Sequence, residues 1–383
     1  MIVYIFNLII TCFLLTITRS KELRSDSKTH RIVIIVMSLL IITCVAGFRY
    51  NVGTDFSLYE SFFFEMPKFD LFNDNIEPVF IILGKFAYFL NSKSSTLMFF
   101  LIALWIYSII YYISIKNCKY YDLSIFLFIT FGFFTGSMNG LRQWMAIPVI
   151  YLALQSFANK NYKRSVLYYI ISIMCHKSCI LLLPFIVASL VIKKEKTRFI
   201  IIVASIIVYV NYRWFNQMLL EFLINIPMFS KYIKYMTTWG EINTNVLVMP
   251  MFTLLSYLAY YFFIYKKKIK SNNFFRIVIN MLIFGFFTSL LGTKVHYFER
   301  IQYYFVLSLI FVVPYIYSKL SIDYKKLAMP FCLIMGLLFY VYSLNKNGAN
   351  PLPYKTIFQQ YKYSYNMEVR HEKNKIQYYS TNI

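Results

Sequence analysis

The chain has 383 residues, of which 59% are hydrophobic and 14% are charged, and its formal net charge is +23. A composition this apolar excludes an ordinary soluble enzyme and predicts a helical protein that crosses a membrane several times, because about 20 apolar residues span the hydrocarbon layer. The positive charge does not indicate nucleic acid as a partner, since the basic residues lie mostly in short links between apolar runs, where they orient membrane helices.

Apolar runs along the chain predict an all-α, polytopic integral membrane protein with about twelve transmembrane helices, some of them short or broken. The first run, residues 1–18, leads into a basic stretch, so we expect a retained membrane helix and not a cleaved signal peptide. Residues 78–91 form a shorter apolar candidate. The other predicted spans are residues 32–48, 97–115, 122–138, 141–158, 165–175, 178–192, 198–211, 245–265, 274–291, 301–318 and 327–344.

Basic links between these runs predict the topology. Under the positive-inside rule they face the cytoplasm, which places the N-terminus outside. Residues 165–192 must then enter and leave the membrane as short helices broken at His176. The stretch of residues 49–95 must begin and end outside, so we expect residues 78–90 to form a re-entrant or interfacial helix. Irregular backbone at membrane depth needs protein or water around it, which indicates a cavity there. The basic links are residues 19–31, 116–119, 160–164, 193–198, 266–270 and 319–326.

We expect one membrane domain, residues 1–354, followed by a flexible polar tail, residues 355–383, which has no apolar period. The six cysteines are scattered, mostly inside apolar runs, and predict no disulfide framework. Cys175, His176 and Cys179 share a helical face, but no fourth ligand lies nearby. We therefore expect neither a metal site nor a cofactor.

Polar residues first interrupt the apolar pattern at residues 49–55, after the second predicted span. Gly53 permits a turn there, and Asp55 lies four residues before Tyr59. Asp55 is a candidate to orient sugar hydroxyls, to act as a base or to pair with Arg49; alternatively, it caps an outer helix. The outer loop is acidic, and its carboxylates are further candidates for chemistry. Its acids are Asp55, Glu60, Glu65, Asp70, Asp74 and Glu77.

Two arginines lie beside predicted helix ends. Arg142 and Gln143 follow Gly140, which permits a tight entry into a helix whose first N–H groups can bind an anion. Arg300 precedes an aromatic run. A guanidinium offers a fork of donors that suits a pair of phosphate oxygens, so both arginines are candidates for binding a lipid pyrophosphate. The alternative for either is to extend toward lipid headgroups, as long cations at helix ends do.

An imidazole and an ammonium group lie at the predicted helix break. His176 can take a proton near neutral pH and is followed by Lys177 and a serine. Because ionisable residues at membrane depth are costly, this position indicates function. His296 and Glu299 are three residues apart, so they share a face if a helix already runs there. These two are secondary candidates.

The order of these motifs resembles the EpsG family of polysaccharide-biosynthesis membrane proteins, which are related to the Wzy O-antigen and capsule polymerases. The resemblance extends over residues 30–355. It is carried by Arg-Tyr-x-x-Gly-Thr-Asp from Arg49, Gly-Leu-Arg-Gln from Gly140, His-Lys-Ser from His176, Arg300 before aromatic residues, and a late Pro-Tyr pair.

The resemblance implies a glycosyltransferase on the outer face of the bacterial cytoplasmic membrane. Such an enzyme joins oligosaccharide repeat units carried on undecaprenyl diphosphate, giving O antigen, capsule or exopolysaccharide. Its expected partners are these lipid-linked units and the bilayer, and the resemblance also admits a chain-length regulator and a flippase.

In such an enzyme a guanidinium stabilises the diphosphate leaving group, and Arg142, helped by Arg300 or Arg49, is the first candidate. A base takes the proton of the acceptor hydroxyl, and three groups are candidates for it: His176, Asp55 and Glu299. The expected catalytic residues are His176, Arg142, Asp55 and Glu299, and the expected substrate-binding residues are Arg49, Arg142, Gln143, Lys177, Arg300 and Tyr59.

Three other functions stay open. A flippase or transporter of lipid-linked oligosaccharides would place charges deep in several spans and show a repeat between its halves, and the chain shows neither clearly. An O-antigen ligase would have a larger outer loop late in the chain than residues 291–301 provide. A scaffold without enzymatic activity would tolerate Arg142→Ala.

Overall fold

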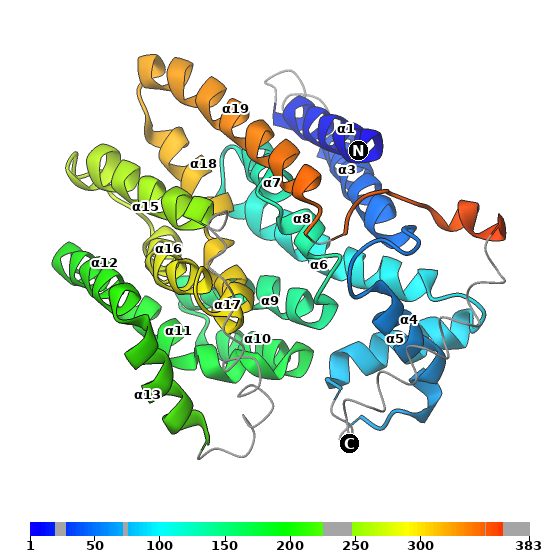
Figure 1. Ribbon diagram of the computed structural model, residues 1–383. Coiled ribbons are helices and arrows are strands. Elements are labelled where there is room, and N and C mark those ends of the chain that lie inside the picture. The colour runs from blue at the N-terminus through cyan, green and yellow to red at the C-terminus, as the bar shows by residue number, and fades with distance from the viewer. Residues whose placement is uncertain (20–27, 72–75, 225–246, 349, 363–383) are drawn as a thin grey trace.

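The computed structural model describes residues 1–19, 28–71, 76–224, 247–348 and 350–362, and most of these residues are helical (Figure 1). Within these ranges no strand forms, although Arg49 and Thr356 make an isolated antiparallel bridge. The prediction of an all-α protein is therefore confirmed. Helices are expected because in lipid each backbone N–H and C=O must be satisfied within its own segment.

The helices follow the predicted apolar runs in chain order. In the first half they are α1 (Ile2–Arg19), α3 (Lys28–Gly47), α4 (Phe56–Glu65), η1 (Met66–Lys68), α5 (Pro78–Leu90), α6 (Thr96–Asn117), α7 (Tyr121–Thr130), α8 (Phe133–Gly136), α9 (Leu141–Ala158), α10 (Tyr162–Cys175), η2 (Lys177–Leu182) and α11 (Leu183–Val191). In the second half they are α12 (Glu195–Val210), α13 (Tyr212–Ile224), α15 (Val248–Tyr260), η5 (Tyr261–Tyr265), α16 (Asn273–Gly292), α17 (His296–Val306), α18 (Leu309–Lys319), α19 (Ile322–Lys346) and η6 (Ile357–Lys362).

Seven helical segments in the described part of the chain are long and apolar enough to cross a membrane, and an eighth results if the bent pair α12–α13 counts as one span. The prediction of a multi-pass membrane protein is therefore confirmed. Most of the other predicted spans are shorter helices, whereas α9 has 18 residues but is less apolar, which is why fewer than twelve helices qualify. Residues 122–138 fold as α7 and α8, with Gly132 at φ +78° between them, and residues 165–192 fold as α10, η2 and α11. The predicted break at His176 is thus present.

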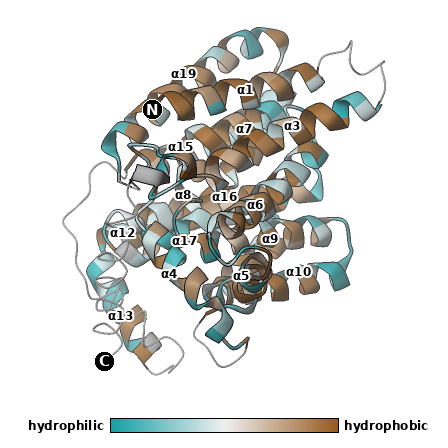
Figure 2. Ribbon diagram, turned by 90° about the vertical axis from the view of Figure 1, so that its right-hand side faces the viewer, coloured by the Kyte–Doolittle hydropathy of each residue, from teal (hydrophilic) through white to brown (hydrophobic). Residues whose placement is uncertain are grey.

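Burial separates central helices from peripheral ones. In α16, 89% of the most apolar 18-residue stretch is buried, whereas in α19 the share is 17%. Accordingly α16 packs against α17, α15, α12 and α9, and α19 lies at one edge of the molecule near α1 (Figure 1). Hydrophobic residues predominate in α1, α3 and α19 (Figure 2), and many of them are exposed, as expected for helices that face lipid.

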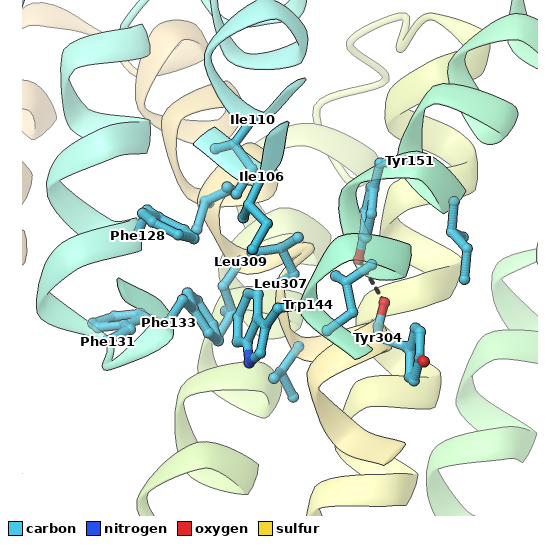
Figure 3. Packing of buried hydrophobic residues seen from close by; sticks show 14 of the residues in the cluster. Ile106, Ile110, Phe128, Phe131, Phe133, Trp144, Tyr151, Tyr304, Leu307 and Leu309 are labelled. Atoms are coloured by element: carbon cyan, nitrogen blue, oxygen red, sulfur yellow. Dashed lines mark hydrogen bonds between the residues drawn. The ribbon is translucent and has the colours of Figure 1, made fainter. Parts of the chain in front are cut away.

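An aromatic core fixes the beginning of α9. The buried Trp144 ring lies 5.5 Å from the ring of Tyr303 in α17 and 6.2 Å from the rings of Phe128 and Phe133 (Figure 3). About two turns further along α9, the Tyr151 hydroxyl donates a hydrogen bond to the carbonyl oxygen of Tyr304, at 3.0 Å. These contacts hold the first turn of α9 against α7, α8 and α17.

Backbone pairing ties the C-terminal segment to the end of α3. The Tyr50 N–H donates to the Lys355 carbonyl at 2.9 Å, and the Ile357 N–H donates to the Phe48 carbonyl at 3.1 Å. Paired residues thus extend a few positions beyond residue 354, where the polar tail was predicted to begin. Most of that predicted tail, residues 363–383, lies outside the described residues.

Candidate active site

The carboxylate of Glu77 joins two of the predicted site residues. Its Oε2 accepts a hydrogen bond from Nη1 of Arg142 at 2.6 Å, and its Oε1 lies 2.8 Å from Nδ1 of His176. The Glu77 side chain is 4% exposed, whereas the side chains of Arg142 and His176 are 23% and 21% exposed. A buried carboxylate therefore holds a guanidinium and an imidazole that both reach the surface of the protein.

Three helix ends meet at this group. Glu77 immediately precedes α5, whose first residue, Pro78, suits a helix start because its missing N–H would have no helical partner there. Arg142 is the second residue of α9. His176 ends α10 in an extended conformation, with φ −159° and ψ 117°. The N–H of Lys177, the next residue, donates a third hydrogen bond to Glu77, at 3.3 Å.

Two neighbouring side chains govern the ionisation of Glu77. Burial alone raises the pKa of this carboxyl group, but the hydrogen bond with His176 and the charge of Arg142 outweigh it and lower the pKa to about 2. Because the pKa of Glu77 is lower in the folded state, the ionised carboxylate stabilises the fold at pH values above its ordinary pKa of about 4.3. This stabilisation is lost as the pH falls toward 2. Any acid loss of activity above about pH 4.3 must reflect another group.

A second carboxylate holds the entry into α9. Oδ2 of Asp55 accepts a hydrogen bond from the Gly140 N–H at 3.0 Å, and the Asp55 N–H donates to Oδ1 of Asn139 at 3.3 Å. Gly53 is needed for this approach, because its φ is +100° and a Cβ there would lie 2.7 Å from Oδ1 of Asn139. A negative charge is favourable at a helix N-terminus. Asp55 thus stabilises the turn that presents Arg142.

This contact modifies the sequence-based alternatives for Asp55. The residue does precede an outer helix, α4, as expected for a cap, but its side chain makes no capping hydrogen bond to that helix. Its carboxylate binds the start of α9 instead, 85 residues away. We therefore assign Asp55 a structural role beside the site and not the role of the base.

Asp55→Asn separates these two roles. An asparagine carbonyl can still accept the Gly140 N–H, so we expect activity to fall by less than about tenfold, whereas loss of a general base costs about a hundredfold or more. The measurement is the initial rate at equal membrane abundance. A hundredfold loss with normal abundance would restore Asp55 as the base.

Arg49 lies inside the protein and not on the surface of the site. It is 1% exposed, and it donates hydrogen bonds to the carbonyl oxygens of Ala46, Val52 at 3.2 Å and Met138 at 2.9 Å. Its guanidinium carbon also lies 4.7 Å above the Phe99 ring. A side chain buried on these partners is badly placed to contact a substrate. We therefore propose a structural role for Arg49 in place of its predicted role in substrate binding.

The other predicted site residues differ in their contacts with Arg142 and in their exposure. Gln143 donates from Nε2 to the carbonyl oxygen of Arg300 at 2.6 Å, which joins the first turns of α9 and α17. Arg300 is exposed, and Glu299 beside it is partly exposed. Tyr59 is buried against the Arg142 guanidinium and so supports that side chain from α4. The Lys177 side chain is exposed next to His176.

Glu77 is the residue whose importance sequence reasoning missed. It appeared only as one of six acids in the outer loop. The available signal was its position directly before Pro78, at the start of an apolar helix predicted to be re-entrant. An acid there, unlike the others in the loop, is drawn toward membrane depth and needs partners.

The chain was compared with known proteins. The model of the EpsG family matches residues 32–356, a range that includes every site residue described above. None of the curated proteins and none of the solved structures matches the chain.

Proposed function

Because the chain belongs to the EpsG family, a family of Wzy-like polysaccharide polymerases, we propose that it is a membrane glycosyltransferase acting on lipid-linked oligosaccharides. It joins repeat units carried on undecaprenyl diphosphate. The observation that carries this proposal is the pairing of Arg142 and His176 on one buried carboxylate, because the reaction needs a cation for its leaving group and a base for its acceptor.

The proposed reaction forms one glycosidic bond and breaks one sugar–phosphate bond. A hydroxyl oxygen of the acceptor unit attacks the anomeric carbon of the growing glycan. The bond from that carbon to the diphosphate oxygen breaks, and undecaprenyl diphosphate leaves with the electron pair. The hydroxyl proton passes to a base, so the step needs no oxidant, reductant or nucleotide.

Arg142 is assigned to the leaving diphosphate. A guanidinium presents five N–H donors in a planar fork, and Glu77 engages Arg142 through one terminal nitrogen, Nη1. Fixed donors aimed at developing negative charge are the largest single source of rate enhancement in many enzymes, and they act most strongly where water is excluded. Arg300 is assigned as the second cation for the diphosphate. It is exposed in α17, and its carbonyl oxygen accepts the hydrogen bond from Gln143 of α9.

His176 is assigned as the base that accepts the acceptor proton. Among the three candidates, Asp55 is occupied at the start of α9, and His176 shares the carboxylate of Glu77 with Arg142. A neutral imidazole suits proton abstraction near neutral pH. Glu299 lies in α17, next to Arg300 in the sequence, and is not one of the residues that the Glu77 carboxylate joins.

We place the site on the outer side of a bacterial cytoplasmic membrane. Helix α9 runs from the site at Gly140 to residue 158, and α10 returns to His176, so the basic link at residues 160–164 lies at the opposite end of both helices. The positive-inside rule assigns that end to the cytoplasm.

Accessibility of single cysteines tests this orientation. In a version of the chain without its six native cysteines, we expect a membrane-impermeant maleimide to label Lys68→Cys in intact spheroplasts. Lys163→Cys should react only after permeabilisation, and both native side chains are exposed. The reverse pattern would place the site in the cytoplasm and contradict the proposal.

Deletion of the gene tests the function itself. We expect loss of long glycan on gels, with single repeat units still reaching the cell surface or accumulating on the lipid carrier outside. Complementation with the intact gene should restore the polymer. Accumulation of lipid-linked units on the cytoplasmic side would instead identify a flippase, and normal polymer that is never attached to its acceptor would identify a ligase.

A further inference from the structure

We propose that Glu77 is a positioning residue that fixes the tautomer of His176 and, at the same time, the place of Arg142 relative to it. This inference rests on the proposed function, since it concerns how the same site is held ready for glycosyl transfer. It assigns a role to a residue that belongs to none of the motifs from which the site was predicted.

The hydrogen bond between Glu77 and His176 determines which imidazole nitrogen carries the proton. An ionised carboxylate can only accept, so Nδ1 of His176, 2.8 Å from Oε1, must be the N–H donor. In a neutral imidazole the other nitrogen, Nε2, then has a free lone pair. That is the arrangement a base requires, and enzymes commonly use a carboxylate behind a histidine to secure it.

Glu77 itself is held from several directions. Its two oxygens receive hydrogen bonds from Arg142 and from the Lys177 N–H, in addition to the one from His176. The residue after it, Pro78, has a restricted φ angle and begins α5. A carboxylate anchored in this way has one orientation. It therefore fixes the positions of the Arg142 and His176 side chains that it binds.

Burial distinguishes positioning from direct participation. With 4% of its side chain exposed, Glu77 lies behind Arg142 and His176, which are each more than a fifth exposed. A substrate on the accessible side therefore meets the guanidinium and the imidazole before it meets the carboxylate. When Nε2 takes the acceptor proton, the resulting imidazolium lies next to the negative charge of Glu77, which lowers the energy of that state.

The test uses purified protein and lipid-linked repeat units extracted from the deletion strain. We expect Glu77→Gln to lower kcat by about a hundredfold or more, because an amide cannot stabilise the imidazolium as a carboxylate does, while KM changes only a few-fold. Glu65→Gln, which neutralises a partly exposed acid at the end of α4, is the matched control and should retain wild-type rates.

A double-mutant cycle identifies the group through which Glu77 acts. In a His176→Ala background, Glu77→Gln should cause a much smaller further loss, limited to its effect on Arg142, since residues that work as a unit are not additive. Equal rates for Glu77→Gln and the intact chain, or a full additional loss in the His176→Ala background, would overturn the inference. Absence of polymer with the intact chain would instead overturn the proposed function, and this inference with it.

A second variant covers the case in which Glu77→Gln does not accumulate in the membrane. His176→Asn places an amide N–H near the position of Nδ1, so it can keep the bond to Glu77 but has no group at Nε2. We expect normal abundance and a kcat at least about a hundredfold lower. Retention of activity would show that Nε2 is not the base and would overturn the inference.

Discussion

Arg142→Ala is expected to abolish polymer synthesis while the protein remains folded in the membrane. Removal of one fixed donor to a developing oxyanion costs about a hundredfold to a thousandfold in kcat, and here the whole guanidinium is lost. The side chain is partly exposed, and Glu77 keeps its hydrogen bonds with His176 and the Lys177 N–H when Arg142 is removed, so we expect the protein to remain folded. The measurement is glycan length on gels after complementation of the deletion strain, at matched membrane abundance.

The controls for this prediction separate charge from geometry. Arg142→Lys keeps the positive charge but replaces the planar guanidinium with a single ammonium group. An ammonium group cannot bind Glu77 and two phosphate oxygens at the same time, so this variant should restore only a small part of the activity. Arg164→Ala removes an exposed arginine at the far end of α10 and should restore full-length polymer. Full polymer from Arg142→Ala would mean that the protein is a scaffold or that another cation meets the diphosphate.

Arg49→Ala is expected to have the largest effect on stability. Its removal leaves the carbonyl oxygens of Ala46, Val52 and Met138 without this donor inside the protein, and it opens a cavity below the Phe99 ring. Unsatisfied buried carbonyls and lost packing together cost roughly 3 to 5 kcal/mol. Membrane abundance and the thermal unfolding temperature in detergent should both fall, and Arg49→Lys should rescue little because lysine cannot reach several carbonyls as a fork.

The outcome decides between two roles for this arginine. If Arg49→Ala reached wild-type abundance and unfolding temperature but made no polymer, Arg49 would contact substrate, as its place among the polar motifs suggested. If Arg142→Ala proved to be the variant that fails to accumulate, the two assignments would have to be exchanged.

The architecture followed from the sequence because its cause is local. Each apolar run must satisfy its own backbone in lipid, so runs such as residues 274–291 became helices with nearly the predicted ends, Asn273–Gly292. Charge placement also predicted the broken helix at His176, since residues 165–192 had to return to the same side within a short length. Gly140, at φ +53°, begins α9 as the sequence indicated.

The contacts of the site could not be derived in the same way. Glu77 meets Arg142 across 65 residues and His176 across 99, so its partners depend on how α5 packs against α9 and α10. Arg49 and Arg142 looked equivalent, because both lie at helix ends beside polar motifs. Only the tertiary packing turns one of them inward to backbone carbonyls and leaves the other partly exposed.

Reconstitution of the purified chain in liposomes with lipid-linked repeat units tests the central claim most directly. A polymerase should extend the glycan and release one undecaprenyl diphosphate for each glycosidic bond formed, without nucleotide or any other protein. Units that change leaflets without any bond formation or diphosphate release would contradict the account.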